Sequence, residues 1–355
     1  MSKLFNNFLE FLSIRTESNN IDQEGLNRFI LNSFSADCTI EQLVSNGAIM
    51  GFIIKINESY DKPGIIFSGH CDTVPISGVE VSEDDFLITG RGSVDMKYFI
   101  SCIFGIKSEI KKRRFTFPIY LCLSCDEEVS TLGVQLVINS LEKEKKKFDL
   151  CIVGEPTNFL PCNSHCGYYC VRFDVQTTSG HSAIYSMKSN AIYCSIQMIQ
   201  QIIDAKVCSK INISSFSSTQ ISNNSNATLC TFVIELRPNG KEDVDEILRK
   251  INIIVSQVST EISVNYEVET GFIPAFYSEY KSDCARLFDC NQPGAFAAAS
   301  EAPFYKCICK NVIVYGAGKI EAAHSDKEFI LKDDLIRYSK DILNLLDRYN
   351  KFQED

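Results

Sequence analysis

Four short apolar runs, each ending in a turn that carries a histidine or a carboxylate, place the strongest constraint on the fold. The runs are residues 65–67, 119–123, 150–153 and 312–315. The turns after them contain, in the same order, His70 with Asp72, Asp126 with Glu127 and Glu128, Glu155, and His324. Helical patterns at residues 97–112 and 132–147 separate the runs, which is typical of buried strands in an α/β sheet. Because ligand sites of open α/β sheets lie beyond the carboxyl ends of the strands, we expect these side chains at one site.

The middle of the chain, residues 171–272, shows a different pattern. Apolar residues alternate with polar ones in three stretches, residues 171–175, 229–236 and 262–268. Helical patterns lie between them at residues 189–205 and 242–261. Such alternation is typical of an antiparallel sheet with one face toward solvent, so we expect a compact α+β insertion. The remaining residues, 1–170 and 273–355, then form one discontinuous domain that a helix at 332–349 closes.

Charge and hydropathy exclude some classes of partner. The 355 residues include 35 Lys and Arg and 45 Asp and Glu, a formal net charge of −10. Nucleic-acid binding needs a basic stripe that displaces counterions from phosphates, so no nucleic-acid partner is expected. No run of about 18 apolar residues occurs, which argues against a membrane partner. The first twelve residues lack the apolar core of a signal peptide, and we expect a cytoplasmic protein.

The chain contains sixteen cysteines. They are scattered through apolar stretches, unlike the disulfide framework of a small secreted domain, so reduced and mostly buried thiols are expected. Cys122 and Cys125 form a C-x-x-C pair, and Cys162, Cys166 and Cys170 recur at a spacing of four. A soft-metal or redox site stays open as an alternative, although the apolar run around Cys122 favours a buried thiol.

The histidines and carboxylates beyond the apolar runs match the requirements of a paired metal site. Zinc binds imidazole nitrogen and carboxylate oxygen, and a two-metal site needs about five or six such ligands with one carboxylate shared between the ions. Two histidines, Asp95, Glu128 and Glu155 supply that inventory. The unassigned Glu127 is then the natural general base for a metal-activated water. Asp72, two residues beyond His70, would fix the tautomer of that imidazole.

Each of these residues also has a purely structural interpretation. His70 with Asp72 alone is more often structural than a ligand pair. Asp95 would complement the dipole of the helix that follows it. The acidic turn that contains Glu127 would be exposed to solvent, and Glu155 would be an ordinary loop residue. Each alternative is plausible alone, but their coincidence at four strand ends favours the metal site.

In order along the chain, these motifs resemble those of the co-catalytic zinc amidohydrolases. The matching segments are Ser68-Gly-His-Cys-Asp-Thr-Val-Pro75, Gly90-Arg-Gly-Ser-Val-Asp-Met-Lys97, Asp126-Glu-Glu128, Gly154-Glu-Pro-Thr157, Ser179-Gly-His-Ser182 and His324. That family includes acetylornithine deacetylase, succinyl-diaminopimelate desuccinylase, aminoacylase and carboxypeptidase G. The resemblance implies a zinc-peptidase-like α/β catalytic domain with a mixed, largely parallel sheet, interrupted by a smaller ferredoxin-like lid and dimerisation domain.

The resemblance also implies a role for each candidate in the metal site. One zinc ion would be held by His70, Asp95 and Glu155, and the second by Asp95, Glu128 and His324. Asp95 would bridge the two ions. Glu127 would deprotonate the attacking water and pass the proton to the leaving amine. Zinc is the expected metal, although carboxylate-rich sites also accept Co²⁺ or Mn²⁺.

Substrate recognition is implied by further matches. His181 corresponds to a histidine that reaches the partner subunit's active site and stabilises the oxyanion, which implies a homodimer. Arg237 looks like the arginine that binds the substrate α-carboxylate, and Asn224 looks like its polar companion. Ser300-Glu-Ala-Pro-Phe304 resembles a segment of the acetylornithine deacetylase branch, in which Glu301 is a candidate for binding the side-chain amine of ornithine. A surface role for Arg237 and a loop-capping role for Glu301 stay open.

Some residues depart from the family pattern. Tyr98 replaces the small residue usual after Asp-Met-Lys, and residues 183–191 lack the expected proline and glycine. Asn223 and Asn226 lie close to Asn224 in the sequence, so it stays open which of the three asparagines matches the family position. These departures affect the substrate entrance more than the ligands.

The resulting hypothesis is metal-dependent hydrolysis of an N-acyl amino acid, with N2-acetylornithine as the first candidate and arginine biosynthesis as its setting. Succinyl-diaminopimelate, N-acetylcitrulline or a dipeptide would use the same chemistry. A catalytically silent binding protein with this fold is a rival of another class, but the chain retains every expected ligand and the base.

Overall fold

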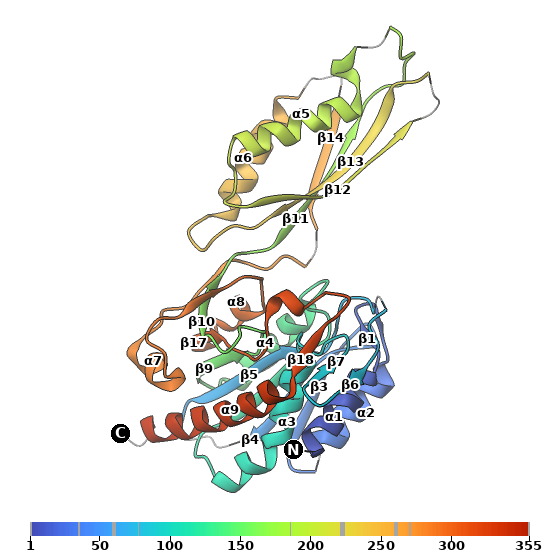
Figure 1. The fold of residues 1–355 in the computed structure, drawn as a ribbon. Helices are drawn as coiled ribbons and strands as arrows, with labels where there is room; N and C mark the ends of the chain where they lie inside the picture. The colour runs from blue at the N-terminus through green and yellow to red at the C-terminus, as the bar shows by residue number, and fades with distance from the viewer. Residues whose placement is uncertain are drawn as a thin grey trace. The chain divides into compact units, whose positions relative to one another are not determined.

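The computed structural model describes residues 2–34, 36–58, 62–76, 78–184, 186–220, 224–258, 262–269 and 271–353. The chain divides into two compact units (Figure 1). The discontinuous unit comprises Met1–His165 and Phe276–Asp355, and the inserted unit comprises Cys166–Ala275. The sequence predicted the insertion at residues 171–272. None of the described helices is long and apolar enough to cross a lipid bilayer.

A mixed sheet forms the centre of the discontinuous unit. In the described residues its strand order is β15-β10-β17-β9-β5-β8-β4-β3, with β16 beside β10. The bounds are β3 Thr39–Ser45, β4 Ala48–Asn57, β5 Gly64–His70, β8 Ile119–Ser124, β9 Phe148–Val153, β10 Cys162–His165, β15 Phe276–Tyr277, β16 Gly294–Phe296 and β17 Cys309–Val314. The central strands β17, β9, β5 and β8 run parallel, and β10, β4 and β3 are antiparallel to their inner neighbours. The predicted α/β fold with a mixed, largely parallel sheet is confirmed.

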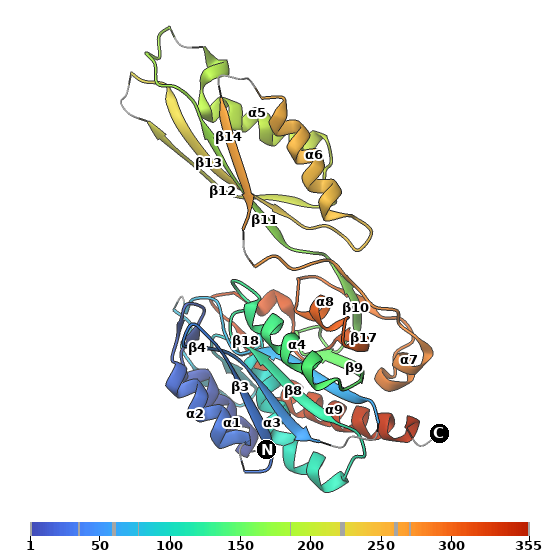
Figure 2. The same ribbon diagram turned by 180° about the vertical axis from the view of Figure 1, so that it is seen from behind.

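Helices cover both faces of this sheet (Figure 1, Figure 2). One face carries α1 (Ser2–Ser13), α2 (Gln23–Phe34), α3 (Lys97–Arg113) and α9 (Lys332–Phe352), with α7 (Ser282–Phe288) against α9. The other face carries α4 (Leu132–Glu144) and α8 (Ala302–Tyr305). Burial on both faces is the usual state of a parallel sheet.

Consecutive residues of the central strands enter two different hydrophobic cores. Ile65 and Phe67 of β5 pack in the core that contains α1, α2, α3 and α9, whereas Ile66 packs in the core that contains α4 and α8. Leu121 and Tyr120 of β8 alternate in the same way. Because both faces are buried, these strands are apolar without interruption, and each such side chain contributes about 1.5–3 kcal/mol by its burial.

A smaller sheet brings two segments of the candidate site together. Strand β18 (Phe329–Leu331) pairs antiparallel with β7 (Leu87–Thr89), which also pairs with β6 (Ser82–Glu83). His324 lies between the short helix η2 (Ile320–Ala322) and β18. The segment that leads from His324 to β18 therefore lies beside the segment that leads to Asp95. Two short strands near the N-terminus, β1 (Thr16–Glu17) and β2 (Asn20–Ile21), form a separate pair.

The inserted unit has the predicted ferredoxin-like topology. Its elements are β11 (Tyr169–Gln176), η1 (Met187–Ser189), α5 (Ala191–Asp204), β12 (Ile211–Gln220), β13 (Ala227–Leu236), α6 (Val244–Ser256) and β14 (Ser263–Val268). The sheet order β12-β13-β11-β14 places the first and third strands of a β-α-β-β-α-β unit in the centre. Val171, Phe173 and Val175 pack with α5 and α6 in a core of its own. Strand β12 was not predicted, because its serine-rich residues are mostly exposed.

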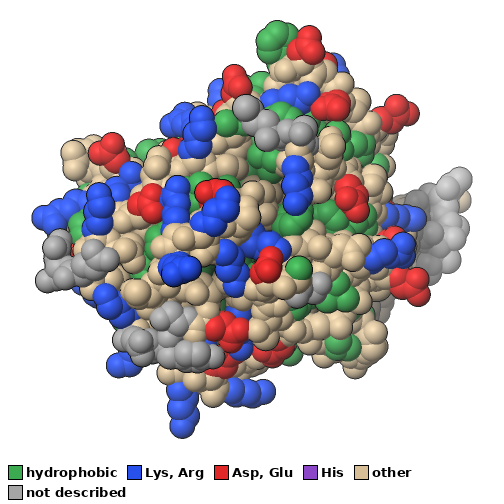
Figure 3. Space-filling model, turned by 90° about the horizontal axis from the view of Figure 1, so that it is seen from below, with side chains coloured by type: hydrophobic (Ala, Val, Ile, Leu, Met, Phe, Trp, Pro, Cys, Tyr) green, Lys and Arg blue, Asp and Glu red, His purple; other side chains and the backbone are tan. Residues whose placement is uncertain are grey.

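One face of the molecule carries mixed surface charge. On the face shown in Figure 3, Lys and Arg side chains are interspersed with Asp and Glu. Acidic residues outnumber basic ones by ten in the whole chain. The absence of a nucleic-acid partner stays a prediction from this balance.

Candidate metal centre

The carboxyl ends of three neighbouring parallel strands deliver most of the candidate residues. His70 is the last residue of β5, Asp126 to Glu128 follow β8, and Glu155 follows β9. The register aligns His70 with Ser124 and Ser68 with Val153, so the three strands end at nearly the same level. The predicted convergence at this edge of the sheet is therefore present.

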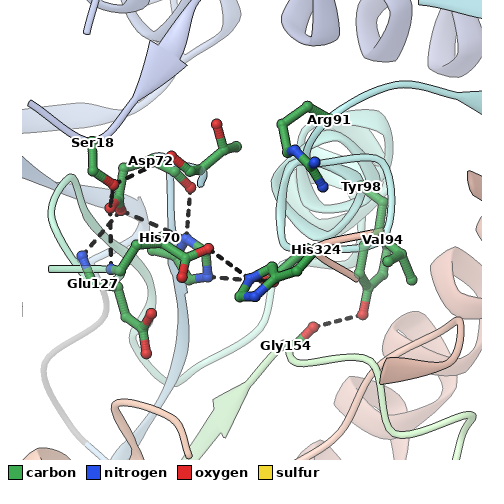
Figure 4. A network of polar contacts seen from close by, with 12 residues as sticks. Ser18, His70, Asp72, Arg91, Val94, Tyr98, Glu127, Gly154 and His324 are labelled. Atoms are coloured by element: carbon green, nitrogen blue, oxygen red, sulfur yellow. Dashed lines mark hydrogen bonds and ion pairs between the residues drawn. The ribbon is translucent and has the colours of Figure 1, made fainter. Parts of the chain in front are cut away.

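Asp95 lies between two histidines. Its Oδ1 is 3.1 Å from His70 Nε2, and its Oδ2 is 2.9 Å from His324 Nε2. Figure 4 shows the His70 and His324 side chains converging on this point from different segments of the chain. One carboxylate with each oxygen toward a different imidazole is the arrangement that a bridging ligand requires.

Glu128 completes a compact group of ligand atoms. Its Oε1 is 3.0 Å from His324 Nε2. Potential ligand atoms of His70, Asp95 and Glu128 all lie within 4.8 Å of one another. Imidazole and carboxylate are suitable donors for Zn²⁺ and for related divalent ions, so these residues fit a metal centre.

Burial and proximity shift the pKa values of this group. Burial alone would raise the pKa of Asp95, but its contacts with His324 and His70 lower it below its ordinary value. The same contacts, with Asp95 first and then Glu128, raise the pKa of His324 to about 10. The contact with Asp95 also raises the pKa of His70 well above its ordinary value, against the effect of burial. Protons thus balance the negative charge of these residues, and divalent cations would replace those protons.

Asp72 connects the His70 segment to the acidic turn after β8. Its carboxylate accepts hydrogen bonds from Ser18 Oγ at 2.8 Å and from the backbone N–H groups of Glu127 and Glu128 at 3.1 and 3.2 Å. His70 Nδ1 lies 2.9 Å from the backbone carbonyl of Asp72 and 3.6 Å from its Oδ1. Because a carbonyl only accepts, Nδ1 carries a proton in this contact, and Nε2 is the nitrogen that could serve as a ligand atom. The nearer orienting group is thus the Asp72 backbone, whereas the sequence had indicated its carboxylate.

Glu127 is adjacent in the chain to the candidate ligand Glu128, and among the described residues its carboxylate has no hydrogen-bonded partner. Burial raises the pKa of Glu127 well above its ordinary value, and the charge of Glu128 adds to this effect, while His70 opposes it. In Figure 4 no dashed line reaches the carboxylate at the end of the Glu127 side chain. A raised carboxylate pKa suits a group that must both accept and release a proton.

Glu155 is buried next to this group. It is 4% exposed, and burial raises its pKa well above the ordinary value, with a further contribution from the charge of Asp95. Glu155 is not part of the three-residue ligand group found among the described residues. The preceding Gly154 carbonyl accepts a hydrogen bond from the Tyr98 hydroxyl at 2.6 Å, which Figure 4 shows. The unusual Tyr98 therefore supports the turn that carries Glu155.

Glu301 lies in the interior of the discontinuous unit. It is 1% exposed, its Oε2 accepts from Ser68 Oγ at 3.3 Å, and its Oε1 has no partner among the described residues. Burial raises the pKa of Glu301 to about 7. Solvent is therefore almost excluded from this carboxylate.

The remaining three candidates belong to the inserted unit. His181 is exposed, its Nδ1 accepts from the Ala183 N–H at 3.2 Å, and Ser182 N donates to the backbone carbonyl of Asn224 at 2.9 Å. His181 and Asn224 are therefore neighbours, while Asn223 lies outside the described residues. Arg237 follows the other end of β13, where it donates to Glu235 and stacks 4.4 Å from the Tyr168 ring centre.

A cavity of about 550 Å³ borders the segments next to two predicted ligands. Its lining includes Pro156 and Thr157, directly after Glu155, and Lys319 and Ile320, shortly before His324. All of these residues belong to the discontinuous unit. The cavity has the size of a small-molecule site.

Comparison with known proteins decides the family. The family model described as peptidase family M20/M25/M40 matches residues 66–348. This chain belongs to that peptidase family. The match includes every predicted metal ligand, so the M20 chain is a hydrolase with a candidate metal site of the required donor types.

Individual relatives agree with this assignment. The M20 chain is 27% identical to an acetylornithine deacetylase of Buchnera aphidicola over an alignment of 317 residues, with coverage of 81% of this chain and 81% of that protein. It superposes on a tripeptidase of Staphylococcus aureus with a TM-score of 0.80, 16% identity and coverage of 99% and 98% of the two chains. A dinuclear metal-binding M20 peptidase of Bacillus subtilis gives a TM-score of 0.69, 12% identity and 97% coverage of both chains. The structural matches establish the fold.

Sequence reasoning missed two buried residues of the M20 chain, Glu328, which contacts the backbone at the candidate ligand Asp95, and its partner Arg91. Glu328 is fully buried and accepts hydrogen bonds from the backbone N–H groups of Val94 and Asp95 at 3.0 and 3.1 Å. Arg91 is its ion-pair partner. The available signal was an acidic residue four positions after His324, but nothing local distinguishes it from an exposed acid.

Proposed function

We propose that this M20 hydrolase removes the acyl group from an N-acyl amino acid, with N2-acetyl-L-ornithine as the substrate and ornithine and acetate as the products. The observation that carries the proposal is Asp95, whose two carboxylate oxygens face His70 and His324, with Glu127 beside them. The similarity to an acetylornithine deacetylase over 81% of the chain supports this choice of substrate. Such a reaction would feed arginine biosynthesis in the cytoplasm.

The ligands divide into two sets that share Asp95. His70, Asp95 and Glu155 would hold one ion, and Asp95, Glu128 and His324 would hold the other. Zinc is the proposed metal, with Co²⁺ or Mn²⁺ as alternatives of similar ligand preference. Two ions held by these residues would supply Lewis acidity to polarise the amide carbonyl and to lower the pKa of the attacking water.

Glu127 moves the proton of the reaction. Its carboxylate accepts one proton as the water oxygen bonds to the amide carbon, and it donates that proton to the amine nitrogen as the C–N bond breaks. The raised pKa of Glu127 favours the second step, because the protonated form persists until the leaving group takes the proton. The products are a carboxylic acid and a free amine, so the atoms balance.

The inserted unit would supply substrate contacts. We assign His181 to the developing oxyanion, and Arg237, with Asn224, to the α-carboxylate. Asn224 precedes β13 and Arg237 follows it, and a ten-residue strand spans roughly 33 Å. One small substrate cannot meet both ends of that strand in a single chain. This separation supports a homodimer in which each substrate meets Arg237 of one copy and His181 with Asn224 of the other.

Glu301 stays the candidate for the side-chain amine of ornithine. Its support is the resemblance of residues 300–304 and the unpartnered Oε1. An ammonium group is the partner that a buried carboxylate of this kind lacks.

Released amine from a panel of substrates tests the function. The panel comprises N2-acetylornithine, N-acetylcitrulline, succinyl-diaminopimelate and a dipeptide, each assayed with zinc-loaded protein at several concentrations. We expect the highest kcat/KM for N2-acetylornithine. Strong turnover of another member without turnover of N2-acetylornithine would replace the substrate and keep the chemistry. No amine from any member would favour the silent binding protein.

A further inference from the structure

A buried ion pair lies behind the candidate metal centre. Arg91 and Glu328 are 4% and 0% exposed, and Arg91 Nη1 lies 2.8 Å from Glu328 Oε2. They are separated by 237 residues in the sequence. The other carboxylate oxygen of Glu328, Oε1, accepts the backbone N–H groups of Val94 and Asp95 at 3.0 and 3.1 Å. The two oxygens of Glu328 therefore have different partners.

This pair connects the three segments that carry His70, Asp95 and His324. Arg91 Nε donates to the Pro75 carbonyl at 3.2 Å, which reaches the segment after β5. Gly90 N donates to the Glu328 carbonyl at 3.1 Å, and the pairing of β18 with β7 begins at the next residue. The pair is thus a buried junction between segments that are distant in the sequence.

The segment before Asp95 needs such a junction. Gly90 and Gly92 adopt φ values of +155° and +84°, a region that L side chains rarely enter, so local propensity does not define this backbone. A bridging carboxylate has to present both oxygens within a few tenths of an ångström of two metal positions. Because Glu328 accepts the N–H of Asp95 itself, it fixes the backbone from which that carboxylate projects.

We propose that Glu328, held in place by Arg91, is a positioning residue for the metal centre and that its carboxylate orients Asp95 to bridge two ions. The inference rests on the ligand set proposed above. Its test measures metal binding and not turnover, so a wrong substrate would leave it intact. Groups that orient metal ligands through hydrogen bonds change metal affinity by about 10–100-fold when they are replaced.

Two double variants isolate the hydrogen bonds from the charge. Arg91→Met with Glu328→Gln keeps an oxygen that can accept the two N–H groups, whereas Arg91→Met with Glu328→Met removes it. Both variants remove both charges, so neither leaves a buried charge unpaired. The control variant, Arg113→Met with Asp347→Asn, removes an ion pair between α3 and α9.

The readouts are Zn²⁺ affinity by competition with a chromophoric chelator, the visible spectrum of the Co²⁺-loaded protein, and urea unfolding of the metal-free protein. We expect Arg91→Met with Glu328→Met, the Met–Met variant, to bind zinc about 10–100-fold more weakly than the wild type and to have an altered Co²⁺ spectrum. The Gln variant should recover most of that affinity, and the control should match the wild type. Equal losses in both variants, or wild-type affinity in the Met–Met variant, would overturn the proposal.

Glu328→Asp provides a second test if the Met–Met variant does not fold. This change keeps the charge but withdraws the acceptor by one methylene. Weaker zinc binding and an altered Co²⁺ spectrum are expected, with the metal-free protein still folded. A variant that is only less stable, with zinc affinity and spectrum unchanged, would show a purely structural role and contradict the proposal.

Discussion

Three consecutive carboxylates after β8 have three different sets of partners. Asp126 accepts hydrogen bonds from the N-terminus of α4, and Glu128 lies against His324. Among the described residues the Glu127 carboxylate has no hydrogen-bonded partner, and burial raises its pKa. Composition cannot separate these roles, because the residues are adjacent and chemically similar. The sequence assigned Glu127 as base by elimination and by resemblance, and its position beside the ligands agrees with that hypothesis.

Glu127→Gln should separate catalysis from metal binding. The amide cannot accept the proton of the water, so kcat should fall by about 10²–10⁴-fold, while both metals remain bound. Elemental analysis and steady-state kinetics measure the two quantities. Glu128→Gln is the matched control, and it should lose bound metal. Unaltered kcat in Glu127→Gln would refute the assigned base.

Tyr98→Phe should weaken the turn that carries Glu155. The buried Gly154 carbonyl loses its hydroxyl donor, which costs about 1–3 kcal/mol of unfolding free energy. Tyr338→Phe is a close control, because the Tyr338 hydroxyl donates to the buried Tyr315 carbonyl at 2.9 Å. Urea unfolding should show similar losses for both variants. Only Tyr98→Phe should also lower zinc affinity, and equal affinities in the two variants would contradict the role of Tyr98.

Among the secondary-structure elements, apolar runs were more predictable than exposed or hairpin strands. The strands β5, β8 and β9 were predicted because both of their faces are buried. The hairpin of β3 and β4 was not predicted, although Asn46 and Gly47 at its turn adopt φ values of +50° and +81°, as an Asn-Gly hairpin turn requires. That dipeptide was the signal available in the sequence.

Asp126 should stabilise α4. Its carboxylate accepts the N–H groups of Leu132 and Gly133 at 2.9 and 2.7 Å, which are among the unpaired donors at the start of that helix. Asp126→Ala should therefore reduce the unfolding free energy by about 0.5–2 kcal/mol in urea titrations. Asp126→Asn keeps an acceptor and should recover much of the loss. An alanine variant as stable as the wild type would show that the cap contributes nothing.

For the whole molecule, the sequence predicted a discontinuous fold and the set of strand ends, but not the contacts that hold the site together. The candidate metal ligands were recognisable because each lies in a family motif and all but Asp95 follow an apolar run. The pairing of Arg91 with Glu328 was not, because it joins residues 237 positions apart and depends on the final packing. The Ser18 contact to Asp72 is a similar long-range contact.

Removal of the inserted unit should separate metal binding from turnover. His165 pairs with Phe276 in adjacent antiparallel strands, so Asn-Gly can replace residues 166–275 as a two-residue turn. The inserted unit has its own core, and the discontinuous unit keeps both of its cores. We expect a folded chain that binds two metals but loses at least about 10²–10³-fold in kcat without His181. Full turnover by the shortened chain would exclude a catalytic role for the inserted unit.

The most direct test of a two-metal amide hydrolase is a titration of metal-free protein with zinc during hydrolysis of N2-acetylornithine. Chelation should abolish amine release, and activity should return with added zinc until two ions are bound per chain. Activity that persists in metal-free protein, or that reaches its maximum with only one zinc ion bound per chain, would contradict the two-metal mechanism.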